Sequence, residues 1–312
     1  MWDIFLKTLP FFALIGLGYS AARLRFFSQE AVASLTRFVF YFALSALIFR
    51  FTAKLPLGQL LDWDFILAYL SASTVVYLLA TFVALRRNVG IAEAAIEAQC
   101  AVIGNVGFLG LPLLLLLLGE SSVGPNLIVL IIDLVVFSNI LVILITIGQQ
   151  GQINLGTFKL IGNGLVRNPM ILAIGAGMFW AGFMLSIPGP VDEFLSILGA
   201  AATPGALFVI GASLAAKSTE RISVAMWLSF CKLVLHPAAV AVSALWIFSV
   251  EPYAAAVMIA VASLPVAGNI YILAQNYDVA PQRVSAAILV STVASVVTVS
   301  LVVAWVSTNI IL

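Results

Sequence analysis

Long apolar runs, separated by short segments with charges, glycine or proline, most constrain the fold of this chain. Only 9% of its 312 residues are charged and 63% are hydrophobic, whereas a soluble domain carries about 25% charged residues. Because so few charges cannot cover a water-exposed surface, lipid must be the solvent. A bilayer-spanning helix needs about 20 apolar residues. This criterion predicts ten spans, at about residues 5–22, 34–52, 65–85, 97–118, 126–147, 169–187, 194–215, 225–248, 253–275 and 284–308.

Lysine and arginine in the short loops predict the orientation of these spans, because cytoplasmic loops carry an excess of both. The even-numbered loops carry almost none, with Lys54 as the main exception. The odd-numbered loops carry nine of the fourteen basic residues, namely Arg23, Arg25, Arg86, Arg87, Lys159, Arg167, Lys217, Arg221 and Arg283. The odd loops are therefore expected in the cytoplasm and both termini outside it. We interpret the first apolar run as a retained span, because no basic segment precedes it.

The two halves of the chain resemble each other at an offset near 159 residues. Residues 14–18 match residues 173–177, and residues 45–49 match residues 204–208. Each half holds five spans, and an odd number places the second half in the bilayer in the opposite orientation. We therefore predict two inverted five-helix repeats, at residues 1–150 and 165–312.

Helix-weakening residues interrupt spans 4 and 9 at corresponding places. Proline lacks an amide proton and frees backbone carbonyls, and irregular backbone at membrane depth is tolerated only against protein or a water-filled cavity. Two broken helices that cross would present positive half-helix N-termini, which suit an anion. The predicted substrate-binding residues in the two segments are Asn105, Gly107, Pro265, Gly268 and Asn269. The alternative is that glycine and proline here only permit close packing or kinks.

Isolated ionisable residues within spans are functional candidates, because charges are costly in a bilayer. Asp133 lies in span 5, and Lys232 and His236 lie four residues apart on one face of span 8. We expect Asp133 to bind a proton and Lys232 to balance its charge, with His236 tuning or relaying the proton. The alternative is a structural ion pair and a packed histidine.

Three further polar residues lie in or beside these spans. Asn139 in span 5 is a secondary candidate for substrate binding. Glu97 and Glu251, at the starts of spans 4 and 9, lie near the predicted interfaces, where we expect water and headgroups to solvate them.

Both broken segments carry motifs of a known family. The pattern Asn105-x-Gly-Phe-Leu-Gly-x-Pro112, together with Pro265-x-Ala-x-Asn269-x-x-x-Leu-Ala-x-x-Tyr277, resembles the auxin efflux carrier family, which includes bacterial malonate and malate transporters. The resemblance extends over all ten spans. It implies a scaffold of spans 1, 2, 6 and 7 and a mobile transport domain of spans 3–5 and 8–10. It also implies a substrate site at Asn105, Pro265 and Asn269, an elevator-like motion and a homodimer.

The chain departs from the plant carriers of that family in its short central loop, at about residues 148–168, which leaves no room for a long regulatory loop. A bacterial carboxylate is therefore a better match than auxin. We predict a secondary transporter of a small organic anion in a bacterial cytoplasmic membrane, with proton coupling, sodium coupling or no coupling ion left open. A channel and a ligand-binding sensor of the same fold are the alternatives.

Other function classes find less support in the sequence. It holds no HExxH or GxSxG motif, so we do not expect an enzyme. The net charge of +1 argues against nucleic acid as a partner. The two cysteines form no CxxC pair, and neither a metal nor a cofactor is expected.

Overall fold

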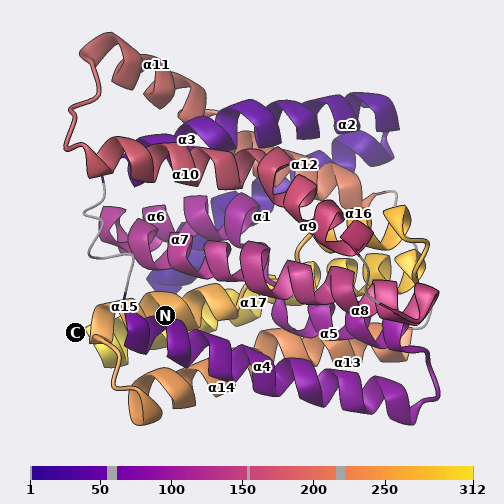
Figure 1. The fold of residues 1–312 in the computed structure, drawn as a ribbon. Helices are drawn as coiled ribbons and strands as arrows, with labels where there is room; N and C mark the ends of the chain where they lie inside the picture. The colour runs from indigo at the N-terminus through magenta and orange to yellow at the C-terminus, as the bar shows by residue number, and fades with distance from the viewer. Residues whose placement is uncertain (1, 55–61, 153–154, 216–221, 312) are drawn as a thin grey trace.

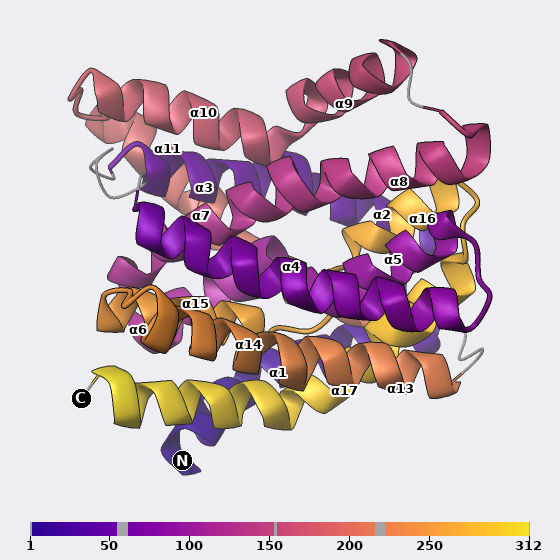
Figure 2. The same ribbon diagram turned by 60° about the horizontal axis from the view of Figure 1, so that its bottom comes forward.

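The computed structural model describes residues 2–54, 62–152, 155–215 and 222–311. Regular structure in these ranges is helical, with one isolated β-bridge. Most helices lie side by side with their axes roughly aligned, some parallel and some antiparallel (Figures 1 and 2). Six helical runs are long and apolar enough to cross a membrane, at Gln29–Thr52, Trp63–Arg86, Glu120–Gln150, Gly189–Leu214, Ile222–Ile247 and Pro281–Ile310. The prediction of an all-helical membrane protein is confirmed in these terms.

The described residues of the first half form eight α-helices, of which α5 and α6 are separated by a break. They are α1 (Trp2–Arg23), α2 (Gln29–Phe38), α3 (Leu44–Thr52), α4 (Trp63–Arg86), α5 (Ile91–Val102), α6 (Leu111–Leu118), α7 (Val123–Ile132) and α8 (Ser138–Gln150).

The second half contains a similar break, between α15 and α16. Its helices are α9 (Leu155–Arg167), α10 (Pro169–Gly182), α11 (Gly189–Ala200), α12 (Ala202–Leu214), α13 (Ile222–Phe230), α14 (His236–Val242), α15 (Pro252–Ala262), α16 (Asn269–Asn276) and α17 (Pro281–Val306).

The central segment differs from the loop that we expected at about residues 148–168. Helix α8 continues to Gln150, and α9 then occupies Leu155–Arg167. The physical reason for the next boundary is local: the Asn168 side chain accepts hydrogen bonds from the amides of Met170 and Ile171, and Pro169 occupies the first turn of α10. The connection between the halves is therefore short but largely helical.

Several long helical runs contain π-helical turns, in which the hydrogen bonds skip one more residue than in an α-helix. These turns often mark functional sites in other proteins. They lie at Val39–Ala43, Val106–Gly110, Asp133–Phe137, Cys231–Leu235, Ser243–Ile247 and Ser307–Ile311. Asp133, Lys232 and Gly107 all fall within such turns, and His236 directly follows one.

Glycines allow two pairs of helices from opposite halves of the chain to approach closely. A Cβ atom on Gly18 of α1 would lie 2.0 Å from the Phe208 carbonyl oxygen of α12. A Cβ atom on Gly177 of α10 would lie 3.1 Å from the Phe49 carbonyl oxygen of α3. The two glycines are separated by 159 residues, and so are the two phenylalanines. The same contact therefore occurs twice, with the halves exchanged.

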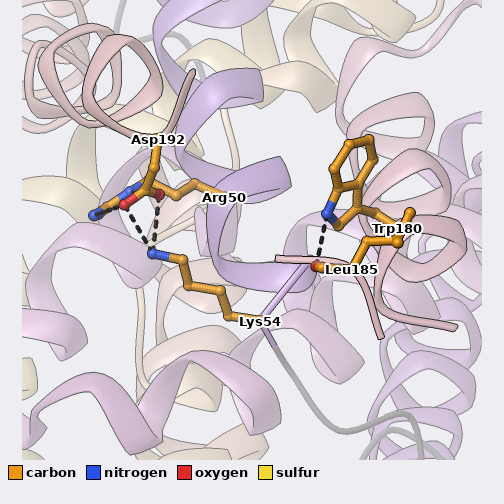
Figure 3. A network of polar contacts seen from close by, with 5 residues as sticks. All are labelled: Arg50, Lys54, Trp180, Leu185 and Asp192. Carbon is orange, nitrogen blue, oxygen red and sulfur yellow. Dashed lines mark hydrogen bonds and ion pairs between the residues drawn. The ribbon is translucent and has the colours of Figure 1, made fainter. Parts of the chain in front are cut away.

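Charged side chains also join the two halves at one end of the helices. Arg50 in the last turn of α3 donates from Nε to Asp192 Oδ1 at 2.7 Å and from Nη2 to Oδ2 at 3.1 Å (Figure 3). Lys54 lies 2.9 Å from the same carboxylate. Asp192 occupies the first turn of α11, where the helix dipole also favours a negative charge. Nearby, Trp180 Nε1 donates to the Leu185 carbonyl oxygen at 2.9 Å.

Both ends of the chain lie in the left half of the two ribbon views. Two of the basic residues used for the predicted orientation, Lys217 and Arg221, lie outside the described residues. The side of the membrane that each end faces stays a prediction.

Candidate functional site

The two broken helices meet at their breaks. Helix α5 ends at Val102 and helical structure resumes at Val106, while α15 ends at Ala262 and α16 begins at Asn269. Between them, Gly104 and Val266 form an antiparallel bridge.

The hydrogen bonds of this bridge are reciprocal. The Asn105 amide donates to the Pro265 carbonyl oxygen at 2.9 Å, and the Ala267 amide donates to the Ile103 carbonyl oxygen at 3.1 Å. The two donors, Asn105 and Ala267, are 162 residues apart in the sequence, and so are the two acceptors, Ile103 and Pro265. We call residues 103–105 and 265–267 the crossover.

The helical segments that leave the crossover have unpaired backbone donors. The amides of Gly107 and Phe108 have no acceptor in the part of the chain that the structure describes. The same is true of Gly268 and Asn269 at the start of α16. Unpaired amides at a helix N-terminus carry partial positive charge and bind anions. Four such donors therefore flank the crossover.

The two predicted asparagines also keep hydrogen-bonding capacity at the crossover. Asn105 is 8% exposed, and its side chain makes no hydrogen bond to the described residues. The Asn269 Oδ1 atom is buried and likewise has no partner there. An asparagine amide can both donate and accept hydrogen bonds, so these two side chains can bind a polar ligand.

The other three predicted substrate-binding residues of the broken segments have different surroundings. A Cβ atom on Gly107 would lie 2.9 Å from Met170 Cε of α10, so glycine permits this close contact. Gly268 is exposed, with nothing within 4 Å of a Cβ position. Pro265 contributes its carbonyl oxygen to the bridge, and the next amide, of Val266, donates to Ser291 Oγ at 3.1 Å.

Asn139 lies apart from this arrangement. Its Nδ2 atom donates to the Val135 carbonyl oxygen of the preceding turn at 2.6 Å. By contrast, Asn126 of α7, which the sequence reasoning missed, is fully buried, and both polar atoms of its side chain lack partners among the described residues. Its Nδ2 atom lies 3.7 Å from a Cβ position on Gly110, just beyond the crossover.

A buried polar cluster lies beside the crossover and contains the predicted ionisable residues. The Tyr69 hydroxyl donates to Asp133 Oδ1 at 2.9 Å, whereas Asp133 Oδ2 has no partner among the described residues. His236 Nε2 lies 2.9 Å from Ser73 Oγ, and the rings of His236 and Tyr69 are 5.7 Å apart. The cluster joins α4, α14 and the π-helical turn that contains Asp133.

Lys232 connects this cluster with the crossover. It is fully buried, and its Nζ atom lies 3.1 Å from His236 Nδ1 and donates a hydrogen bond to the Ala262 carbonyl oxygen. When Lys232 is an ammonium group, which only donates, His236 Nδ1 is the acceptor and Nε2 carries the proton directed at Ser73. Lys232 and Asp133 do not form a contact ion pair within 4 Å. They are still near enough for their charges to interact.

The sequence did not single out Tyr69 or Ser73. Both are ordinary residues of an apolar helix, and their separation of four residues, which places them on one face, was the only available signal. Their role as partners depends on how α4 packs against α14, which the sequence does not encode locally.

Glu97 is not solvated at an interface, as we had expected, but is fully buried. It pairs with Arg87 at the end of α4 and accepts from Arg283 Nη1 of α17 at 2.5 Å. Arg283 also lies 3.1 Å from Glu93. The fold brings two arginines to Glu97 and removes it from water. The corresponding expectation for Glu251 agrees with the structure, where it is exposed and caps α15 by accepting from the Ala254 amide at 2.8 Å.

The chemistry of the two clusters differs. The crossover offers unpaired amides and neutral side-chain amides, which suit an anionic or polar solute. The neighbouring cluster offers a carboxyl group, an imidazole and an ammonium group, which can bind or release protons. No group of three or more His, Cys, Asp or Glu side chains that could hold a metal ion occurs among the described residues.

Comparison with known proteins identifies the family of the chain. Residues 3–303 match the family Mem_trans, described as "Membrane transport protein". The chain is also 33% identical over 296 residues to a protein of Rhizobium meliloti (strain 1021) named "Putative malonate transporter". The match covers 94% of this chain and 92% of that protein. The resemblance to the auxin efflux carrier type, drawn from the two broken segments, is confirmed, and the chain belongs to the family of membrane transport proteins.

Proposed function

We propose that the protein is a secondary transporter of small organic carboxylates and that the crossover is its substrate site. The observation that carries this proposal is the reciprocal bridge, flanked by four unpaired amides and by the side chains of Asn105 and Asn269. A carboxylate can accept from several such donors at once, and hydrogen bonds to a charged group are stronger than neutral ones. The name of the relative from Rhizobium meliloti makes malonate the first solute to test.

The architecture that we propose is two inverted five-helix repeats, with α1, α2–α3, α10 and α11–α12 as the scaffold. The remaining spans form a transport domain that moves relative to it. Support comes from the Gly18–Phe208 and Gly177–Phe49 contacts, which repeat with the halves exchanged, and from the reciprocal crossover hydrogen bonds. Such paired relations are expected of a pseudo-two-fold axis in the membrane plane.

The contact between the scaffold and the helical segment that follows the first break suits an elevator-like motion. Phe108 stacks on Phe40 with ring centroids 5.9 Å apart and planes 3° from parallel, and Gly107 packs on Met170. These contacts are apolar and carry no hydrogen bond that sliding would break. We further propose a homodimer through the scaffold, in a bacterial cytoplasmic membrane with both termini outside the cytoplasm. The family resemblance and the charge distribution of the loops support these points.

The substrate site can be tested by ligand-induced thermal stabilisation of the purified protein. We expect malonate, or another small carboxylate from a panel, to stabilise the wild type, because a ligand at about 100 times its Kd adds about 2.7 kcal/mol. Asn105→Ala and Asn269→Ala should each weaken binding about tenfold to 100-fold, the effect of losing a hydrogen bond of about 1.5–3 kcal/mol to a charged group. The exposed Asn163→Ala serves as the matched control and should bind like the wild type. Equal stabilisation of all three variants would place the ligand elsewhere.

We also propose that Asp133 is the site of proton coupling, with Lys232 balancing its charge and His236 tuning it. Asp133 Oδ2 is buried without a partner, and an unpaired carboxylate oxygen in such surroundings favours protonation. An inwardly directed proton gradient should accelerate uptake by the wild type. Asp133→Asn should abolish this acceleration, because the asparagine side chain binds no proton at physiological pH. Exchange of labelled for unlabelled solute without a gradient should persist.

The control for this variant is Asp278→Asn, at an exposed position with φ of 52°, a left-handed conformation that asparagine also tolerates. It should keep the full response to the gradient. Gradient-driven uptake by Asp133→Asn at the wild-type rate would remove Asp133 from the coupling mechanism.

A further inference from the structure

Four helix ends meet at the crossover, and their dipoles have opposite signs. The segments that begin at Val106 and Asn269 present N-termini with partial positive charge, whereas α5 and α15 end there with partial negative charge. Taken alone, such an arrangement offers binding sites for an anion and for a cation. The backbone of the crossover therefore does not by itself determine the sign of the charge that the site prefers.

Lys232 lies against the negative end of α15 and beside the break that follows α5. Its Nζ atom donates to the carbonyl oxygen of Ala262, the last residue of α15, which would otherwise be one of the unpaired carbonyls of that terminus. The same atom lies 3.3 Å from a Cβ position on Gly104, two residues beyond the end of α5, and its Cε atom lies 3.2 Å from that position. One ammonium group thus contacts the chain at both breaks.

No acidic side chain in the described ranges lies within 4 Å of this ammonium group. The side chains beside it are His236, whose Nδ1 atom lies 3.1 Å from Nζ, and Leu264, which adjoins it at Gly104. Asp133, the charged group that interacts with it through space, is hydrogen bonded to Tyr69 instead. No carboxylate therefore contacts the Lys232 ammonium group directly, whereas the carbonyl end of α15 does.

We infer that Lys232 determines the anion selectivity of the crossover by offsetting the negative ends of α5 and α15. The positive N-termini at Val106 and Asn269 then dominate the field at the substrate. Lys232 acts on the substrate through the crossover backbone and not by direct contact, because it is fully buried behind the Gly104–Val266 bridge. It is in this sense a specificity-determining residue, and the inference rests on the function proposed above.

The test compares ligands of equal shape and different charge. Malonate carries two negative charges, malonamate one and malonamide none. A charge interaction of about 1.4 kcal/mol changes a binding constant roughly tenfold, and the loss of one unit charge near the site is expected to cost about that much for each negative charge of the ligand. Lys232→Met should therefore weaken malonate binding roughly 100-fold and malonamate binding roughly tenfold, while malonamide binding stays within about threefold. Lys232→Arg, which keeps the charge, should retain the preference for malonate over malonamate.

A second variant tests the same idea without removing the charge. In Gly104→Ala the new Cβ atom would lie 3.2 Å from Lys232 Cε and 3.3 Å from Nζ, so the end of the lysine side chain must shift from its present place at the crossover. We expect Gly104→Ala to lose less binding affinity than Lys232→Met does, and to lose more for malonate than for malonamate. Gly16→Ala, with nothing within 4 Å of its Cβ position, is the control and should bind all three ligands like the wild type.

Three outcomes would overturn the inference. Wild-type affinity of Lys232→Met for malonate would show that the ammonium charge is irrelevant and would leave the proposed function intact. An equal loss for all three ligands, in Lys232→Met or Gly104→Ala, would assign Lys232 a structural role only. If the wild type binds no carboxylate, the proposed function fails, and the inference fails with it.

Discussion

A Gly211→Ala variant is expected to lose the native packing of α1 on α12. The added Cβ atom would lie 1.8 Å from the Ile15 carbonyl oxygen and 2.9 Å from the Tyr19 backbone nitrogen. The obstacle is backbone, which cannot rotate away as a side chain can, so the two helices must separate. Overpacking of a core typically costs about 1–3 kcal/mol and more where the backbone must move. We expect a large fall in the yield of monodisperse protein and in the temperature of its thermal unfolding.

Gly18→Ala should have the same effect, because its Cβ atom would lie 2.0 Å from the Phe208 carbonyl oxygen of the opposite helix. The matched control is Gly16→Ala, two residues away on α1, where nothing lies within 4 Å of the Cβ position. The control should unfold like the wild type or at a slightly higher temperature, since alanine favours helix over glycine by about 1 kcal/mol. Wild-type yield and stability of Gly211→Ala would contradict the close approach of α1 and α12.

The second large effect is expected from Glu97→Ala, which leaves Arg283 without its closest acidic partner. Arg283 is 7% exposed and Glu97 is fully buried, so neither charge can turn to water in place of the other. Removal of one partner of a buried pair typically costs about 3–5 kcal/mol. The cost should be visible as a lower midpoint in denaturant or thermal unfolding of the purified protein.

Three further variants separate the effect of the buried charge from that of losing a side chain. Glu93→Gln alters a carboxylate whose side chain is 41% exposed, and a pair of this kind contributes about 0–1 kcal/mol. A double variant, Glu97→Gln with Arg283→Met, removes both charges and should recover part of the stability lost in Glu97→Gln alone. If Glu97→Ala is no less stable than Glu93→Gln, the buried pairs of Glu97 do not stabilise the fold.

The sequence predicted the crossover well because its cause is local. Glycine and proline weaken a helix wherever they occur, so the segments around Asn105 and Pro265 predicted two breaks, and the structure has helix ends at both. Periodic apolar runs and short polar loops likewise predicted the helical fold. The π-helical turns that contain Asp133 and Lys232 were not predicted. In such a turn each hydrogen bond spans one more residue than in an α-helix, and this change leaves no signal in a continuously apolar sequence.

The partners of the predicted residues could not be found in the same way. Tyr69 and Ser73 contact Asp133 and His236 across separations of 64 and 163 residues, and Asn126 lies in an ordinary apolar run. Such contacts depend on the rotation of each helix about its axis, which a sequence that is apolar on both its buried and its exposed faces does not reveal. The error at Glu97 has a similar cause, since proximity to a predicted interface gave no information about Arg283.

Flux carried by the crossover is the central claim, and solute counterflow in proteoliposomes tests it most directly. Vesicles are loaded with unlabelled malonate, diluted into a trace of labelled malonate, and followed without any ion gradient. We predict that the wild type and Asn163→Ala transiently accumulate label, whereas Asn105→Ala combined with Asn269→Ala does not. A wild type that binds a carboxylate but shows no counterflow with it would identify a sensor or a channel. Accumulation by the double variant at the wild-type level would contradict the assignment of the crossover as the transport site.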